Sequence, residues 1–388
     1  MSAAGTGPLR LAFLGDGNSV HLREWLGYFA SRGHEVTLLV PEAREVDEGL
    51  PAGISIERFV PFNHRKMRLV GALDARRSLR RILARIRPDV LEAQYLTVNG
   101  WHALMSGFHP YSVAVWGSDV LVTPRTSPMG LVYARLALRS ADLVIGGSEA
   151  LIGEAVRLGA PPGRVHAIPY GVDLTRFTPG PDPAGLRSRL GLEGRRVVFS
   201  PRAMRPLYRH GLVVEALARL PGDVAVVMVS YLADPVELES VRRRAVELGV
   251  SDRLIIVPSI DHSEMPGYYR LADVIVSLAA SDSTPITLFE ALACGRPVVA
   301  ADLPAVREVM GRLDPASLVP AGDAAATAAA LIRILDMPSG DTAAAAIRGE
   351  ALVAEVADRQ KNLRLIEDLY RALATTRRPA RKELRHGI

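Results

Sequence analysis

Residues 281–302 read SDSTPITLFEALACGRPVVAAD and place two carboxylates, Asp282 and Glu290, eight positions apart. Between them stands a small, turn-forming Ser-Thr-Pro, and an apolar run, DVIVSLA (273–279), comes directly before. Pro285 occupies a position where the first turn of a helix tolerates proline. The stretch therefore predicts a strand, a turn that holds Asp282, and a helix with Glu290 one turn inside it.

The N-terminus of a helix that starts here could bind an anion. The backbone amides of Ile286 and Thr287 would point out of the helix N-terminus, which is a ready site for an anion. A diphosphate that joins a nucleoside to a sugar needs such amides, together with one carboxylate for each polyol. The alternative is a Ser/Asp cap on an ordinary amphipathic helix with an exposed Glu290, and this stretch alone leaves both open.

Strands and helices alternate along both halves of the chain. The strands expected in the first half are LRLAFLG (9–15), HEVTLLVP (34–41), ISIERFVPF (54–62), DVLEAQY (89–95), SVAVWGSDV (112–120) and ADLVIGGS (141–148). After a segment rich in Pro and Gly at 172–185, RRVVFSP (195–201) opens a second alternation. This pattern predicts an α/β protein with two domains, 1–178 and 186–361, whose parallel sheets face each other across a cleft.

Composition narrows the class of protein. The chain has 388 residues, 48% of them hydrophobic and 23% charged, which is typical of globular domains. Its net charge is +5, but no nucleic-acid-binding motif occurs, so we expect no nucleic-acid partner. The one cysteine, Cys294, excludes a disulfide framework and is expected to be a small buried helix residue. Without a signal-peptide pattern or a long apolar run, the sequence predicts a cytoplasmic protein.

The opening stretch resembles the acidic-x7-acidic signature of the GT-B glycosyltransferases, specifically the large retaining family usually numbered four. FEALACGRPVVAAD (289–302) matches the second half of that signature. GDGNSVHLREWLGYFASRGHEVTLL (15–39) resembles the first Gly-rich loop and helix of the family. The resemblance covers roughly residues 10–310 in order. It implies two Rossmann-like domains and a last helix, about 362–388, that crosses back to the first domain.

The resemblance also implies roles in binding a nucleotide-sugar. Glu290 would hydrogen-bond the nucleoside ribose, and Asp282, one methylene shorter than the usual Glu, would contact the donor hexose. Arg202, after the first strand of the second domain, would clamp the diphosphate, with Gly17 in the Gly-rich loop also at the donor. Where relatives carry a Lys this chain offers Arg209 or His210, and a fixed cation favours Arg209.

In the first domain the residues depart from the family pattern. Many relatives have a His where this chain has Trp116, so Asp119 or Ser118 could take over a polar role. We place Asp119 with Asp282 and Arg202 among the catalytic candidates; the alternative for Asp119 is a helix cap. His21 and Arg23 follow the Gly-rich turn and either reach the cleft or lie on the helix surface.

Cofactors and metals are not expected. GDGNSV lacks the third glycine of a dinucleotide fingerprint, despite Glu42 after the second strand. No Asp-x-Asp pair occurs in the sequence and the histidines are scattered, so arginine and helix amides would hold the diphosphate in place of a metal.

The function expected is transfer of a hexose from a UDP- or GDP-sugar to a hydroxyl acceptor, with retention of anomeric configuration. The acceptor could be a sugar, a lipid-linked sugar or a small-molecule alcohol. The alternatives are a sugar-nucleotide epimerase of the same fold and a non-catalytic nucleotide-sugar-binding protein. The basic helix at 75–88 is expected to pack on the sheet; the alternative is peripheral contact with the inner face of the membrane.

Overall fold

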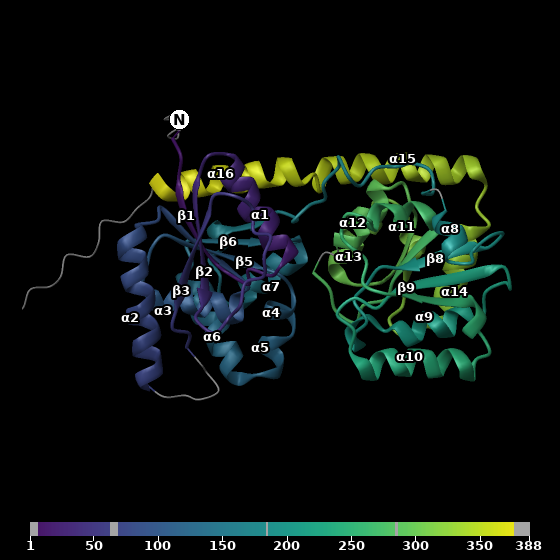
Figure 1. The fold of residues 1–388 in the computed structure, drawn as a ribbon, viewed down its shortest axis with the longest axis horizontal. Helices are drawn as coiled ribbons and strands as arrows, with labels where there is room; N and C mark the ends of the chain where they lie inside the picture. Colours follow the sequence, from purple (N-terminus) through teal and green to yellow (C-terminus); the bar gives the residue numbers. More distant parts are fainter. Residues whose placement is uncertain (1–6, 63–68, 184, 284–285, 376–388) are drawn as a thin grey trace, which may run out of the picture. The chain divides into compact units, whose positions relative to one another are not determined.

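The computed structural model describes residues 7–62, 69–183, 185–283 and 286–375. The chain folds as two compact units. The first runs up to Ile168 and resumes at Leu363, and the second is Pro169–Asn362. Figure 1 shows both as α/β units, and each is described by itself.

The first unit is built on a parallel sheet of seven strands in the order β3-β2-β1-β4-β5-β6-β7. The strands are β1 (Arg10–Leu14), β2 (Glu35–Pro41), β3 (Ile54–Phe59), β4 (Val90–Gln94), β5 (Tyr111–Val115), β6 (Leu143–Gly146) and β7 (Val165–Ala167). The order reverses between β1 and β4. In open α/β sheets the crevice at the carboxyl ends of two such strands is where ligands bind.

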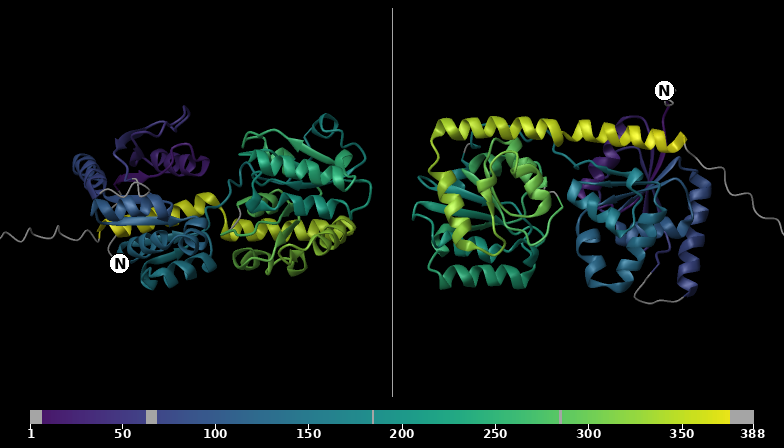
Figure 2. Two further views of the ribbon diagram at one scale, coloured as in Figure 1. Left: turned by 90° about the horizontal axis from the view of Figure 1, so that it is seen from below. Right: turned by 180° about the vertical axis from the view of Figure 1, so that it is seen from behind.

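Helices cover both faces of this sheet (Figures 1 and 2). They are α1 (Val20–Ser31), α2 (Leu69–Ile86), α3 (Trp101–Ser106), α4 (Ser118–Leu121), α5 (Thr123–Thr126), α6 (Pro128–Ser140), α7 (Glu149–Leu158) and α16 (Arg359–Thr375), with short turns η2 (Leu96–Gly100) and η3 (Pro162–Arg164). Leu91 and Ala93 of β4 join the core formed with α2, α3 and α6. Because side chains alternate along a strand, Glu92 faces the other layer, where it meets α16.

The second unit has a parallel sheet of six strands in the order β10-β9-β8-β11-β12-β13. The strands are β8 (Arg196–Ser200), β9 (Val224–Val229), β10 (Leu254–Val257), β11 (Val274–Ser277), β12 (Val298–Ala301) and β13 (Leu318–Val319). This order reverses between β8 and β11, which pair directly.

Two cores sandwich the second sheet. Val197, Phe199 and Ile275 pack with α12 and α15 on one face, whereas Val198 and Val274 pack with α9 and α14 on the other. The helices are α8 (Leu186–Arg189), α9 (His210–Leu217), α10 (Pro235–Glu247), α11 (Met265–Leu271), α12 (Ile286–Ala293), α13 (Pro304–Met310), α14 (Ala324–Leu335) and α15 (Ser339–Val356), with short turns η4 (Pro206–Tyr208), η5 (Ser251–Arg253) and η6 (Pro315–Ser317). The predicted alternation of strands and helices, with parallel sheets, is confirmed.

The structure differs from the sequence prediction in several places. Residues 118–121, expected to continue a strand, form helix α4. The short strands β7 and β13 were not predicted. The units divide at Ile168, earlier than residue 178, because Val172 and Phe177 of the Pro/Gly-rich segment pack into the core of the second unit. None of the helices in the described part of the chain has the length and apolar character to span a bilayer.

Candidate active site

The point where the second sheet reverses its order brings Arg202 and Asp282 together. Arg202 follows β8 and Asp282 follows β11, and these strands are neighbours, so both residues leave the sheet at the same edge. The Arg202 Nη2 donates to Asp282 Oδ2 over 2.7 Å, and its Nη1 donates to Thr287 Oγ1 over 3.0 Å. One guanidinium thus joins the loop after β11 to the first turn of α12.

Arg202 is held rigidly and is only 9% exposed. Its Cζ lies 4.2 Å from the centre of the Tyr208 ring, within range of a cation–π contact. Burial lowers the pKa of the Arg202 guanidinium, but the charge of Asp282 together with the contributions of Tyr208 and Tyr269 outweighs burial, and the pKa ends above its ordinary value. The site therefore contains a permanent, pre-oriented cation beside the start of a helix.

Glu290, on helix α12, is more buried than Arg202. It is 4% exposed; its Oε2 accepts a hydrogen bond from the Tyr269 hydroxyl over 2.7 Å, and its Oε1 lies 3.1 Å from His262 Nε2. Burial, and then the charge of Glu290, raise the pKa of Tyr269 well above its usual range. The alternative of an exposed glutamate on a surface helix is therefore wrong. A carboxylate has about four lone-pair positions, so Glu290 keeps acceptor capacity for a further donor.

The two candidates for a second cation differ sharply. His210 is fully buried, and burial, with a smaller contribution from the charge of Arg202, lowers the pKa of its imidazole to about 4. It is therefore neutral at physiological pH. Arg209 precedes α9 in a left-handed backbone conformation with φ of 51°. It is half-buried, and within the described part of the chain no ion pair occupies its guanidinium. The fixed charge thus favours Arg209 over His210.

The other residues predicted in and around α12 lie at the two ends of this helix. Helix α12 begins at Ile286, so Ile286 and Thr287 form its first turn as expected. Pro285 lies outside the described residues. Cys294 is 1% exposed and burial raises the pKa of its thiol to about 12, so the prediction of a buried residue is confirmed, although Cys294 lies in the turn after α12 and not in a helix.

The first unit has a pocket of about 400 Å³ where its own sheet reverses order. Its lining comes from the loops after β1, β2, β4 and β5 and from α1: Gly15, Asp16, Ser19, His21, Leu22, Pro41, Arg44, Gln94, Tyr95, Val98, Asn99 and Trp116. The His21 ring stacks on Trp116 with centroids 5.6 Å apart, and Trp116 Nε1 donates to Gln94 Oε1 over 3.0 Å. His21 therefore belongs to a pocket wall and not to an outer helix surface.

Arg23 and Gly17 have local roles in the same unit. Arg23 Nε donates to the Gly17 carbonyl over 2.7 Å, and its Nη atoms reach the carbonyls of Asp47 and Glu48. A Cβ at Gly17 would lie 2.8 Å from Val46 Cγ1, so packing requires glycine there. Arg23 thus fixes the loop after β2 instead of reaching a ligand.

Asp119 departs most from its predicted role. It is completely buried, and its carboxylate accepts backbone N–H groups of Leu96, Trp116 and Gly117 at 2.8, 3.1 and 2.8 Å. Burial raises the pKa of Asp119 and these hydrogen bonds oppose the rise. With no exposed oxygen, Asp119 orders the loops after β4 and β5. Its geometry is that of a positioning residue and does not support the predicted catalytic role. Neighbouring Ser118 Oγ lies 2.7 Å from the Tyr95 hydroxyl.

Sequence reasoning missed the aromatic partners of the charged groups. Tyr208 under Arg202 and Tyr269 against Glu290 belong to no recognised motif, and only their distance in space reveals them. Gln94, which orients Trp116, was read simply as the end of a strand.

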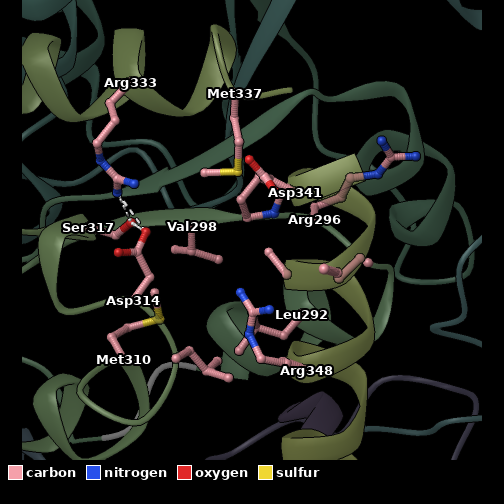
Figure 3. A pocket seen from close by; sticks show the side chains of 16 residues that line it. Leu292, Arg296, Val298, Met310, Asp314, Ser317, Arg333, Met337, Asp341 and Arg348 are labelled. Atoms are coloured by element: carbon pink, nitrogen blue, oxygen red, sulfur yellow. Dashed lines mark hydrogen bonds and ion pairs between the residues drawn. The ribbon is translucent and has the colours of Figure 1, made fainter. Parts of the chain in front are cut away.

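A second pocket of the second unit lies away from these groups (Figure 3). It sits at the amino ends of β12 and β13, beside Val298 and Ser317, with a volume of about 300 Å³. Arg333 on its wall is paired with Asp314 at 2.6 Å and bonded to Ser317 at 2.9 Å. The edge with Arg202 and Asp282 is at the opposite ends of the strands.

Residues 10–148 match the family described as glycosyl transferase 4-like, and residues 186–350 match glycosyl transferases group 1. Together the two matches span well over half of the chain. Gly17 lies in the first match, and the other predicted donor-site residues lie in the second. Both halves of the chain thus match glycosyltransferase families, and the chain is a glycosyltransferase. The epimerase and non-catalytic alternatives find no support among these relatives.

The named relatives of this glycosyltransferase are glycosyltransferases as well. The D-inositol 3-phosphate glycosyltransferase of Xylanimonas cellulosilytica is 28% identical over 345 residues, 80% of this chain and 81% of the relative. A D-inositol 3-phosphate glycosyltransferase of Catenulispora acidiphila is 34% identical over 214 residues, 51% of this chain and 49% of the relative.

Solved structures show the fold. Sucrose-phosphate synthase of Thermosynechococcus elongatus is similar with a TM-score of 0.81 and 20% identity, covering 95% of this chain and 100% of that one. HepE of Anabaena in complex with UDP-glucose is similar with a TM-score of 0.76 and 20% identity, covering 94% and 100%. The predicted GT-B fold is confirmed.

Proposed function

We propose that this glycosyltransferase moves a hexose from a UDP- or GDP-sugar to a hydroxyl acceptor, with retention of anomeric configuration. The observation that carries the proposal is the contact of Arg202 with both Asp282 and Thr287 at the start of α12, above the buried Glu290. It assembles a cation, helix amides and two carboxylates at one sheet edge, which are the groups that a sugar diphosphate requires.

In this proposal the donor is held by its parts. The diphosphate lies against Arg202, Arg209 and the amides of Ile286 and Thr287. Glu290 takes a ribose hydroxyl with its remaining lone pairs, and Asp282 faces the hexose. The predicted contact of Gly17 with the donor stays a prediction. That the Anabaena relative was crystallised with UDP-glucose supports a uridine nucleotide as the first donor to try.

Retention without a metal is the finer part of the proposal. The charge that develops on the departing diphosphate is stabilised by arginine, which needs no metal in that role. Asp119, the carboxylate predicted from the first domain, is enclosed by backbone N–H groups and is not available as a nucleophile. We therefore favour attack of the acceptor on the same face as the leaving phosphate, which assists by accepting the proton.

For the acceptor we propose the pocket of the first unit. His21 and Trp116 offer aromatic surface to a sugar or cyclic polyol ring, while Asn99 and Arg44 offer polar groups. The relatives named for D-inositol 3-phosphate support a small cyclic alcohol as the first acceptor to test.

A lipid-linked acceptor and peripheral membrane contact stay predictions. Helix α2 buries its apolar side, including Leu79 and Leu83, in the core of the first unit. Any contact of that helix with a membrane would therefore depend on its exposed arginines and on Leu73, which is 51% exposed.

The test is incubation with UDP- and GDP-sugars, with and without cyclic polyol acceptors, while nucleotide release and thermal melting are followed. Transfer predicts release of UDP or GDP that depends on acceptor, together with protection against melting by one nucleotide series. Conversion of the donor to its C2 epimer, or protection without any turnover, would contradict the proposal.

A further inference from the structure

We propose that Glu92, Gln94 and Tyr370 are positioning residues that fix the Trp116 wall of the first-unit pocket and tie that wall to helix α16. The proposal concerns residues that neither the family matches nor the signature motif singles out. Its effect on the reaction rests on the proposed use of this pocket for the acceptor, whereas its effect on Trp116 does not.

The three residues form a continuous chain of hydrogen bonds. Trp116 Nε1 donates to Gln94 Oε1 at 3.0 Å, and Gln94 Nε2 donates to Glu92 Oε1 at 3.4 Å. The Tyr370 hydroxyl of α16 donates to Glu92 Oε2 at 2.7 Å. Glu92 and Gln94 lie two positions apart on β4, so both face the side of the sheet on which α16 lies.

The direction of the two bonds made by Gln94 is fixed by chemistry. Indole N–H can only donate, so the oxygen of the Gln94 amide must face Trp116. The amide nitrogen of Gln94 must then face Glu92, which receives it and the Tyr370 hydroxyl on separate oxygens. An amide that is held at both ends cannot flip, and the indole keeps one orientation.

Burial makes each link costly to lose. Glu92 is 1% exposed, Gln94 5% and Tyr370 0%. A buried polar group that has lost its partner raises the free energy of the folded state. When one member of the chain is removed, the remaining side chains are therefore expected to shift until their polar atoms form other hydrogen bonds. The end of the chain that has room to move is the pocket wall, where Trp116 is half-buried against His21.

A second buried hydroxyl at the same helix provides a matched control. Tyr28 donates to Glu367 Oε2 at 3.2 Å, so it also joins a tyrosine hydroxyl to a buried carboxylate between α1 and α16. Glu367 bonds Arg32 and Arg371 and has no link to Gln94. Tyr370→Phe and Tyr28→Phe each remove one such hydroxyl, and Tyr370→Phe keeps the ring that stacks on Phe29 at 5.5 Å.

The experiment measures tryptophan emission, donor affinity and acceptor KM for Tyr370→Phe, Glu92→Leu, Glu92→Gln and Tyr28→Phe. The Trp116→Phe spectrum identifies the Trp116 contribution. We expect Tyr370→Phe and Glu92→Leu to shift the Trp116 emission and to raise the acceptor KM about three- to tenfold, the scale of one lost buried hydrogen bond, with nucleotide affinity unchanged. Glu92→Gln, which can still accept from Gln94, should restore much of the loss, and Tyr28→Phe should change neither readout.

Equal effects of Tyr370→Phe and Tyr28→Phe would overturn the proposal, because they would show a general role in docking α16. An unchanged Trp116 emission in Glu92→Leu would overturn it as well. A shifted emission with an unchanged acceptor KM would leave the positioning role standing and would instead remove the acceptor from this pocket.

Discussion

Arg202 is a cation with three contacts, two of which, Asp282 and Thr287, are distant in sequence and meet it only in the fold. Asp282 and Thr287 follow β11, across the point where the sheet reverses its order from β8, and the Tyr208 ring lies against the guanidinium. A buried charge with this many partners is oriented before any ligand arrives, which lowers the cost of binding a diphosphate.

Replacing Arg202 tests that role. Arg202→Ala should weaken free UDP or GDP by about tenfold or more, because a charge-assisted contact contributes roughly 1.5–3 kcal/mol. Isothermal calorimetry measures it. Arg196→Ala is the matched control, since Arg196 lies at the start of β8, the strand that Arg202 follows, and pairs with the exposed Asp223. Nucleotide affinity that is unchanged in Arg202→Ala would remove this residue from the site.

The two carboxylates of α12 and its preceding loop should separate in kinetics. Glu290→Gln should weaken free nucleotide and nucleotide-sugar alike, as a loss in binding. Asp282→Asn should leave free nucleotide affinity within about threefold and lower kcat, because contacts to the hexose matter most as positive charge develops on the ring. The amide oxygen introduced by Asp282→Asn can still accept from Arg202, and Thr287 and Tyr208 keep their contacts, so the guanidinium stays oriented and nucleotide affinity should change little. Loss of nucleotide affinity in Asp282→Asn with retention in Glu290→Gln would reverse the assignment.

How far single residues could be predicted depends on what their chemistry requires. Asp282 and Glu290 stood out because a motif spaces them, and Arg202 because it follows the first strand of the second domain. The structure brings Arg202 and Asp282 into contact, and it buries Glu290. Asp119 was misassigned because a carboxylate before a helix gives the same sequence pattern whether it faces a ligand or backbone N–H groups. Burial, which no local pattern encodes, decides between them.

At the scale of elements, long periodic segments were predictable and short connecting ones were not. Strands such as β1 and β8 are apolar runs that end at Gly or Pro, and their existence follows from the sequence. Residues 95–106 carry no such pattern, yet they form η2 and α3, because Asp119 binds the Leu96 N–H and Asn99 binds the Gln94 carbonyl. Tertiary hydrogen bonds determine that segment.

The stability of the fold is predicted to depend on pH through Glu367 of helix α16. Burial would raise the pKa of Glu367, but hydrogen bonds from Arg371, Arg32 and His34 lower it to about 2. A lowered pKa stabilises the fold fully above about pH 4.5, the ordinary value, and that stabilisation is lost as pH falls towards 2. Glu367→Gln should therefore lower the free energy of unfolding by about 1–3 kcal/mol at pH 7, and by less below pH 4.5.

Urea unfolding of wild type and Glu367→Gln at pH 7 and pH 3.5 measures the difference. Glu355→Gln serves as the control, since Glu355 pairs with Arg312 in an exposed position and should have little effect at either pH. A difference that grows as pH falls would contradict the assignment.

For the whole molecule, the account predicts transfer without a metal. Activity should survive EDTA, because the proposed cation at the diphosphate is arginine. Within the described ranges no cluster of three or more His, Cys, Asp or Glu side chains has the geometry to hold a metal ion. An absolute requirement for Mg²⁺ or Mn²⁺, restored when the ion is added back, would contradict the proposed diphosphate clamp.

The central claim is that the chain transfers a hexose with retention, and the anomeric configuration of the product tests it most directly. Proton NMR of a reaction with an α-linked UDP- or GDP-hexose and a cyclic polyol acceptor follows the anomeric signals of donor and product together. The account predicts that the donor signal falls as a product with an α linkage appears, with UDP or GDP released in equal amount. A β-linked product would contradict front-face attack, and a donor consumed only to its epimer would contradict transfer itself.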